Sequence, residues 1–121
     1  MIDQRMCVQR TVVITAGQSL STMLDKSKYK NITIFLPANW DDAKITFAGS
    51  DTDAGPFNQV VNSITAAETT VDTAAESKVV ILDGINRDAM AAIPFIKLRS
   101  GTLAVAVNQS ATVTISIVLT R

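Results

Sequence analysis

The sequence contains no histidine and a single cysteine among its 121 residues. Without an imidazole, the Ser-His-Asp and Cys-His arrangements of nucleophilic catalysis cannot form, and the usual general base at neutral pH is missing. One cysteine also excludes a disulfide within the chain, and one sulfur ligand without histidine cannot complete a tetrahedral zinc site. We interpret Cys7, which has the apolar neighbours Met6 and Val8, as a buried structural thiol.

Charged side chains are few and balanced. Eleven lysines and arginines stand against eleven aspartates and glutamates, and together they make up 18% of the chain. Because affinity for nucleic acid depends on clustered cations that neutralise phosphates, we expect no nucleic-acid partner. The one basic cluster, Lys26, Lys28 and Lys30, alternates with other residues. We interpret it as a solvated face of an extended segment rather than as a phosphate site.

Long apolar runs are also absent. The longest covers residues 89–96, contains Pro94 and is far shorter than the roughly 20 residues that cross a bilayer. Charges at Asp3, Arg5 and Arg10 interrupt the beginning of the chain, which leaves no room for the apolar core of a signal peptide. We therefore expect a protein that is made in the cytoplasm and has no membrane partner.

Aromatic residues are scarce, and the carboxylates form no catalytic pattern. Four phenylalanines, one tyrosine and one tryptophan are too few to line the deep cleft that two-carboxylate glycoside hydrolysis requires. Residues 51–55 are similar to the start of a calcium loop, but Asn62 occupies the position of its bidentate glutamate, so we interpret them as a connection between strands. We interpret Asp41 and Asp42 as a turn or a helix cap. The sequence therefore predicts no enzyme, no cofactor and no metal site.

Alternating apolar and polar residues dominate what the sequence does contain. Near the end of the chain, Val113, Ile115, Ile117 and Leu119 alternate with threonine and serine. Turn residues separate such runs, which predicts an all-β, single-domain antiparallel β-sandwich over residues 1–121, jelly-roll-like in its wrapping. Residues 1–12 either belong to it or form an extended arm or strand that pairs with a neighbouring subunit. The other runs cover residues 8–14, 32–36, 45–47, 78–82 and 95–99, with weaker candidates at 58–63 and 68–73 and helical patterns only at 20–26 and 88–93.

Several of these strands are apolar on both faces, at residues 12–14, 34–36, 79–82 and 117–119. A sandwich strand normally keeps one face for solvent, so loops or another subunit must cover the second face, and we favour a subunit for at least one sheet. The candidate contact residues are Val13, Phe35 and Val118. Arg99 joins them as a group that would hold a carboxylate across a subunit contact, unless it is an exposed surface arginine.

Two segments carry a more specific pattern. One is Leu-Pro-Ala-Asn-Trp at residues 36–40, followed by a strand and by Ser50-Asp51. The other is Ile-Pro-Phe-Ile-Lys-Leu-Arg-Ser-Gly-Thr at residues 93–102, followed by Val-Asn-Gln-Ser-Ala at 107–111 and by the terminal strand. Together they resemble small virion proteins of tailed bacteriophages, although residues 51–57 depart from the glycine-rich, aromatic turn of that family. The resemblance implies a jelly-roll or related sandwich that acts as a capsid decoration (cement) protein or as part of a head or tail appendage.

The resemblance leads to two hypotheses about function. The first is a decoration protein on the capsid exterior, made in the cytoplasm of the bacterial host, with the major capsid protein as its partner. It would form a homo-oligomer, dimer or trimer, and stabilise the assembled shell by binding it. The alternative is a receptor- or carbohydrate-binding domain of a head fibre, spike or tail component, for which Tyr29, Trp40 and Phe57 are the available aromatic residues.

Overall fold

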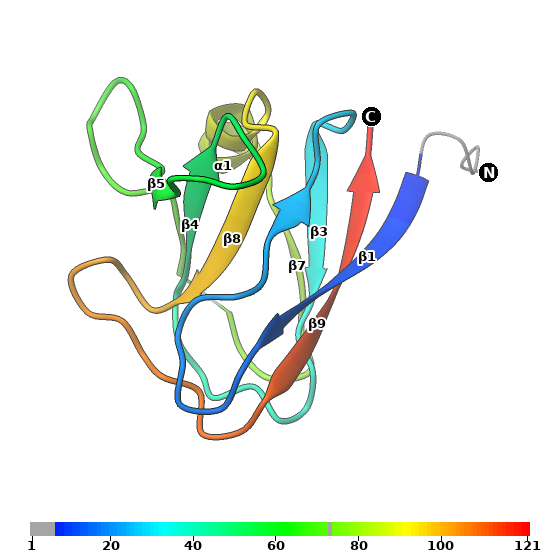
Figure 1. Ribbon diagram of the computed structural model, residues 1–121, viewed down its shortest axis with the longest axis vertical. Helices are drawn as coiled ribbons and strands as arrows, with labels where there is room; N and C mark the ends of the chain where they lie inside the picture. Colours follow the sequence, from blue (N-terminus) through cyan, green and yellow to red (C-terminus); the bar gives the residue numbers. More distant parts are fainter. Residues whose placement is uncertain (1–6, 73) are drawn as a thin grey trace.

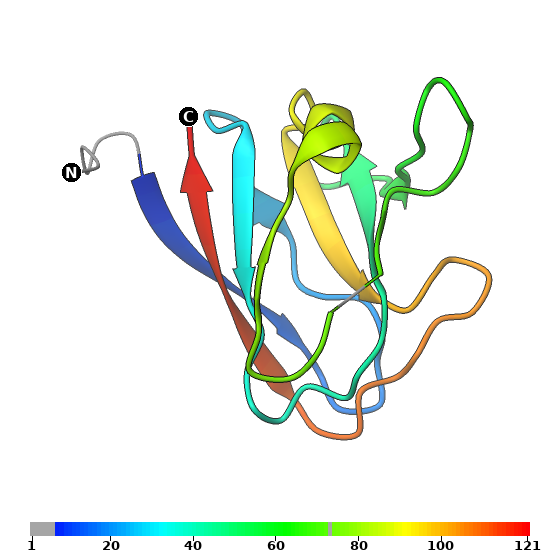
Figure 2. The same ribbon diagram turned by 180° about the vertical axis from the view of Figure 1, so that it is seen from behind.

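Two antiparallel sheets pack face to face in the computed structural model, which describes residues 7–72 and 74–121 (Figure 1 and Figure 2). The four-stranded sheet has the order β1 (Cys7–Ile14), β9 (Val113–Thr120), β3 (Asn31–Phe35) and β7 (Val79–Ile81). The five-stranded sheet has the order β2 (Leu24–Asp25), β8 (Phe95–Ser100), β4 (Ile45–Ser50) and β5 (Asn58–Gln59), and β6 (Thr70–Val71) also pairs with β4. One short helix, α1 (Gly84–Met90), connects β7 to β8. The predicted β-sandwich is confirmed.

The strand order is that of a jelly roll. The first four strands pair with later strands in reverse order: β1 with β9, β2 with β8, β3 with β7 and β4 with β5. The chain therefore forms one long antiparallel hairpin that wraps around the core, so that successive pairs alternate between the two sheets. The additional pairs β3–β9 and β4–β8 join these ribbons into sheets.

The core lies between the sheets and is built from the apolar residues of the alternating strands. On β9, Val113, Ile115, Ile117 and Leu119 are all fully buried. Each such aliphatic side chain contributes roughly 1.5 to 3 kcal/mol when it leaves water. Trp40, in the connection between β3 and β4, is also buried and anchors that connection to the core. The alternation in the sequence thus marks the buried face of the strands.

The expected helix at residues 20–26 is wrong. These residues instead run along the edge of the five-stranded sheet, where β2 pairs with β8. Ser21 donates its N–H to the carbonyl oxygen of Leu98, and its hydroxyl oxygen accepts the N–H of the same residue. Because these bonds satisfy the backbone of β8, an extended conformation replaces the helical one.

The second helical pattern and the weaker strands also differ from their expected bounds. Helix α1 begins at Gly84 rather than near Asp88: the carbonyl oxygen of the extended residue Asp83 accepts the N–H of Arg87, although the Asp83 side chain makes no capping bond. The candidate strand at 58–63 shortens to two residues, since the side chain of Asn62 accepts backbone N–H groups and turns the chain. Of the candidate at 68–73, the strand covers Thr70–Val71, and residue 73 lies outside the described residues. Cys7 is half-buried rather than buried, because β1 lies at the edge of its sheet.

Lys26 is buried, so its interpretation as part of a solvated face is wrong. It is 1% exposed, and its Nζ donates hydrogen bonds to the backbone carbonyls of Met90 at 2.7 Å and Ile93 at 3.0 Å. These carbonyls lie at the end of α1 and in the turn after it, and the carbonyl of Met90 also accepts the N–H of Ile93 at 3.2 Å. Burial lowers the pKa of Lys26 to about 8. Lys28 and Lys30 are exposed, as expected.

Replacing Lys26 by methionine tests this contact. Lys26→Met leaves the carbonyl of Ile93 without its donor and removes one of the two donors of the Met90 carbonyl, and we expect it to lower the free energy of unfolding by about 1 to 3 kcal/mol. The loss should grow from pH 8 to pH 10.5, because there the unfolded chain still binds a proton at Lys26 that the folded chain has released, so rising pH stabilises the folded wild type. Urea unfolding at pH 7 and pH 10 measures both effects. The exposed Lys28→Met is the control, and a loss that is equal at both pH values would contradict the prediction.

Candidate functional site

The outer faces of the two sheets are covered differently. On β4 of the five-stranded sheet, the outward residues Thr46 and Ala48 are 0% and 1% exposed. On β3 and β7 of the four-stranded sheet, the outward residues Phe35, Val79 and Ile81 are 39%, 57% and 66% exposed. Figure 1 shows the long connections after β5 and after β8 on the side of the five-stranded sheet. The chain therefore covers one sheet itself and leaves part of the other open.

The open part of the four-stranded sheet carries several apolar side chains around Thr33. Its register places Phe35 opposite Val79, and Thr33 opposite both Ile81 and Val118, so that these side chains share the outer face. We call Phe35, Val79, Ile81 and Val118 the apolar strip. A contiguous apolar surface that small proteins leave exposed marks an interaction site.

Three of the four residues expected at a subunit contact lie on this outer face. Phe35 and Val118 belong to the apolar strip, and Val13 lies on the same face of β1, opposite Thr114. Phe35 is exposed, whereas Val13 and Val118 are half-buried. The structure thus gathers on one surface three residues from separate strands. The fourth residue, Arg99, lies elsewhere.

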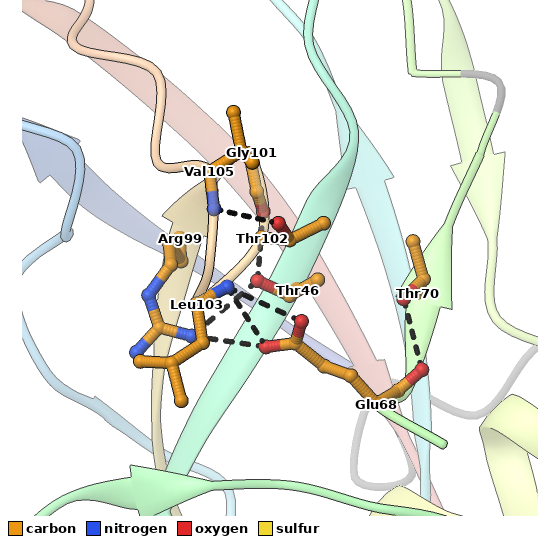
Figure 3. A network of polar contacts seen from close by, with 8 residues as sticks. All are labelled: Thr46, Glu68, Thr70, Arg99, Gly101, Thr102, Leu103 and Val105. Atoms are coloured by element: carbon orange, nitrogen blue, oxygen red, sulfur yellow. Dashed lines mark hydrogen bonds and ion pairs between the residues drawn. The ribbon is translucent and has the colours of Figure 1, made fainter.

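Arg99 lies on β8 of the other sheet, where it forms an ion pair within the chain (Figure 3). Its guanidinium nitrogen Nη1 is 3.3 Å from Oε2 of Glu68, and the two side chains are only 10% and 12% exposed. The same nitrogen donates to the hydroxyl of Thr46 at 3.4 Å. The alternative of an exposed surface arginine is therefore wrong, and the carboxylate that Arg99 binds here comes from its own subunit.

Glu68 also fixes the loop that follows β8. Both of its carboxylate oxygens accept the backbone N–H of Leu103 at 3.2 Å (Figure 3). Gly101 begins this loop with a φ of +88°, and a Cβ there would lie 2.5 Å from the carbonyl oxygen of Val105, so the turn requires glycine. The loop presents Leu103 and Val105 to solvent. Sequence analysis missed Glu68 because its partners Arg99 and Leu103 are 31 and 35 residues away.

Gln109, which belongs to the Val-Asn-Gln-Ser-Ala segment, is a second buried polar residue whose contacts the sequence did not predict. Its Nε2 donates to the carbonyl oxygen of Asp41 at 3.0 Å and to the hydroxyl of Ser100 at 2.8 Å, and its Oε1 accepts the N–H of Asp41 at 2.8 Å. The carboxylate of Asp41 accepts the N–H of Ser110, and this bond lowers the pKa of Asp41. Asp41 and Gln109 therefore tie two loops together, and the Val-Asn-Gln segment has a structural role.

The aromatic residues available for a carbohydrate site are not gathered into one. Trp40 is buried in the core, and the ring of Phe57 lies under Lys97, whose Nζ is 4.7 Å from the ring centre. Tyr29 lines a polar pocket of about 210 Å³, whose other walls are Arg10, Asp25, Ser27 and Lys28. Of three pockets formed by residues 7–72 and 74–121, this one places an aromatic ring beside polar side chains.

Sites of other kinds have little support in residues 7–72 and 74–121. Within these ranges, no three acidic, cysteine or histidine side chains are grouped in a way that could hold a metal ion. In the same part of the chain, no helix has the length and apolar character needed to cross a membrane. An open groove of about 400 Å³ separates Val60 and Val61 from the turn after α1, where Ile93 and Pro94 form its other wall.

Comparisons with known proteins show a likeness of fold. No family model matches the chain, and no curated protein matches its sequence. Among solved structures, the chain is similar to the crystal structure of SPBc2 prophage-derived protein YomS, with a TM-score of 0.53 and 12% identity over 100% of this chain and 98% of that one. A chain from the structure described as "Bacillus endospore appendages form a novel family of disulfide-linked pili" aligns with a TM-score of 0.35 and 12% identity over 95% and 88% of the two chains, which is too loose to indicate a shared fold. The fold therefore resembles that of a prophage-derived protein.

The ion pair between Arg99 and Glu68 gives a stability prediction. Glu68→Ala leaves the buried guanidinium and the N–H of Leu103 without their acceptor, and we expect a loss of about 3 kcal/mol in the free energy of unfolding. Asp72→Ala is the matched control, because it breaks the exposed pair with Lys44 and should cost less than about 1 kcal/mol. Urea unfolding of both variants measures the difference. Equal losses would contradict the assigned role of Glu68.

Proposed function

We propose that this protein is a structural component of a bacteriophage virion, a decoration protein that binds the assembled capsid from outside as a homo-oligomer and stabilises it. The observation that carries the proposal is the apolar strip, which lies open on one sheet while the chain covers the other sheet with its own loops. The fold likeness to a prophage-derived protein along nearly the whole of both chains supports a phage origin.

The chemistry of the strip suits a contact that depends on burial rather than on charge. Its four side chains are hydrocarbon, and the chain has no net charge to steer it toward a charged partner. Covering such side chains removes apolar surface from water, which favours association in proportion to the area buried. A protein that binds only the assembled shell lowers the free energy of that state relative to loosened forms, by mass action.

A receptor- or carbohydrate-binding role has less support. Protein sites for sugars use exposed aromatic rings beside polar groups, and the burial of Trp40 removes the largest ring from any such site. The pocket that Tyr29 lines is the observation in favour of this alternative. Reproducible binding of the purified protein to a glycan array would favour it over the decoration role.

The apolar strip gives the functional prediction. We expect virions without the protein to lose resistance to heat and osmotic shock, and added wild-type protein to restore it. Phe35→Asp and Ile81→Asp place a charge in the strip and should fail to restore it, because the carboxylate would lose its hydration at the contact. Ile64→Asp is the matched control, since Ile64 is 87% exposed on a loop outside the strip, and it should restore resistance fully. Virions that are equally resistant without the protein would refute the decoration role.

A further inference from the structure

Strand β1 is an edge strand whose outer side presents unpaired backbone groups. At its end, Val13 donates its N–H to the hydroxyl of Thr22 and accepts the N–H of Thr22 at its carbonyl oxygen, both on the side away from β9. Backbone groups of an antiparallel strand alternate in direction from one residue to the next. The N–H and C=O groups of Cys7, Gln9 and Thr11 therefore also point away from β9.

The hydrogen bonds of β3 with β7 and β9 also show which residues of β1 point to the free edge. On β3, Leu36 donates to the carbonyl of Lys78 and Ile32 accepts from Leu82, so the even-numbered residues of β3 bind β7 and its odd-numbered residues bind β9. The even-numbered residues of β9 then bind β3, and its odd-numbered residues bind the even-numbered residues of β1. The odd-numbered residues of β1 are left to the free edge.

This edge has only one of the features that usually prevent strands from pairing with other chains. Natural edge strands are short, or they carry proline, a bulge or charged side chains, lysine above all, and β1 carries a single charge, Arg10. β1 has eight residues without proline, glycine or lysine, and its register with β9 is unbroken from Cys7 to Ile14. Within the part of the chain that the structure describes, the outward groups of Cys7 and Thr11 have no hydrogen-bond partner, and the carbonyl of Gln9 accepts only the side chain of Arg10, at 3.2 Å.

We infer that β1 pairs with β1 of a second copy of this chain, antiparallel and about a two-fold axis at Gln9. The three outward residues, Cys7, Gln9 and Thr11, are symmetric about Gln9, and Thr22 blocks the edge at Val13. In this register Gln9 lies opposite Gln9 of the second copy and Cys7 lies opposite Thr11, so every outward N–H and C=O among these three residues gains a partner. The only charged residue of β1, Arg10, lies opposite Val8, whereas an axis at Arg10 would place two cations face to face.

This pairing extends the proposed function. The geometry of the dimer follows from β1 alone, and only its benefit for binding a shell rests on the proposed function. An axis at Gln9 runs perpendicular to the sheet, because residues opposite each other in an antiparallel pair point to the same side. The two four-stranded sheets then form one continuous sheet, and the two apolar strips face the same way. A flat partner such as the shell would contact both strips at once, which strengthens binding through effective concentration.

The first test compares proline substitutions at the two free edges of the sheet. Gln9→Pro removes an N–H that points outward, so the ladder with β9 stays intact and only the second copy loses its bond. Val79→Pro is the matched control, because the N–H of Val79 points away from β3 at the opposite edge of the same sheet. In light scattering we expect a dimer for the wild type and for Val79→Pro and a monomer for Gln9→Pro, with circular dichroism to verify that each variant folds.

The second test fixes the register by disulfide trapping. Gln9→Cys in a Cys7→Ser background should oxidise to a covalent dimer, because directly opposite residues of a hydrogen-bonded pair have Cα atoms about 5.5 Å apart. The natural Cys7 is the control, since in the same dimer the two Cys7 residues are four positions apart, about 13 Å along the strands, and should not form a disulfide.

The outcomes separate this pairing from the proposed function. A monomeric wild type, a dimeric Gln9→Pro, or cross-linking through Cys7 instead of position 9 would each overturn the pairing. If the wild type protects shells and Gln9→Pro remains a dimer, the pairing is wrong and the decoration role stands. If the dimer forms as inferred but virions gain no resistance from it, the decoration role is wrong and the pairing stands.

Discussion

The double pairing of β9 is the constraint on which the outer surface of this protein depends. β9 lies between β1 and β3, so its residues alternate between the two neighbours in their hydrogen bonds and between core and surface in their side chains. A shift of one residue would move its buried aliphatic residues to the outside, so the hydrophobic core locks the register. Once β9 is fixed, the residues of the apolar strip and the groups on both free edges are fixed with it.

Buried polar side chains hold the loops that cover the other sheet. Lys26 binds the carbonyls at the end of α1, Glu68 binds Arg99 and the N–H of Leu103, and Gln109 binds the backbone of Asp41. Each satisfies backbone groups or charges that have no ladder partner, which is the requirement for a loop packed against a core. These three buried polar residues thus lie where the sandwich covers itself, whereas the apolar strip lies on the sheet that the chain leaves partly open.

The sequence could predict features that depend on neighbouring residues, but it could not predict contacts between residues far apart in the chain. The alternation in β9 reports burial directly, and apolar residues on both faces of β3 and β9 identified Phe35 and Val118 as unusual. β2 has only two residues and is therefore too short to show an alternation of apolar and polar residues in the sequence. Lys26, Glu68 and Gln109 were missed or misassigned because nothing near them in the sequence indicates partners that lie tens of residues away. Arg99 was recognised as a carboxylate partner, but its burial depends on a loop whose path the sequence does not encode locally.

The number of residues whose backbone groups point to each free edge also bears on the choice between a dimer and a trimer. A trimer made by strand addition through the four-stranded sheet would need a heterologous contact, with β1 of one subunit paired to β7 of the next. The free edge of β7 offers the outward groups of Val79 and Ile81, which can pair with only two of the three outward residues of β1. In a two-fold pairing of β1 with β1 of the second copy, the same three outward residues of each subunit bind one another. The contact closes after two subunits, so neither β1 is left as an open edge. The length of the free edge, which Thr22 sets by capping Val13, therefore favours the dimer in the proposed assembly.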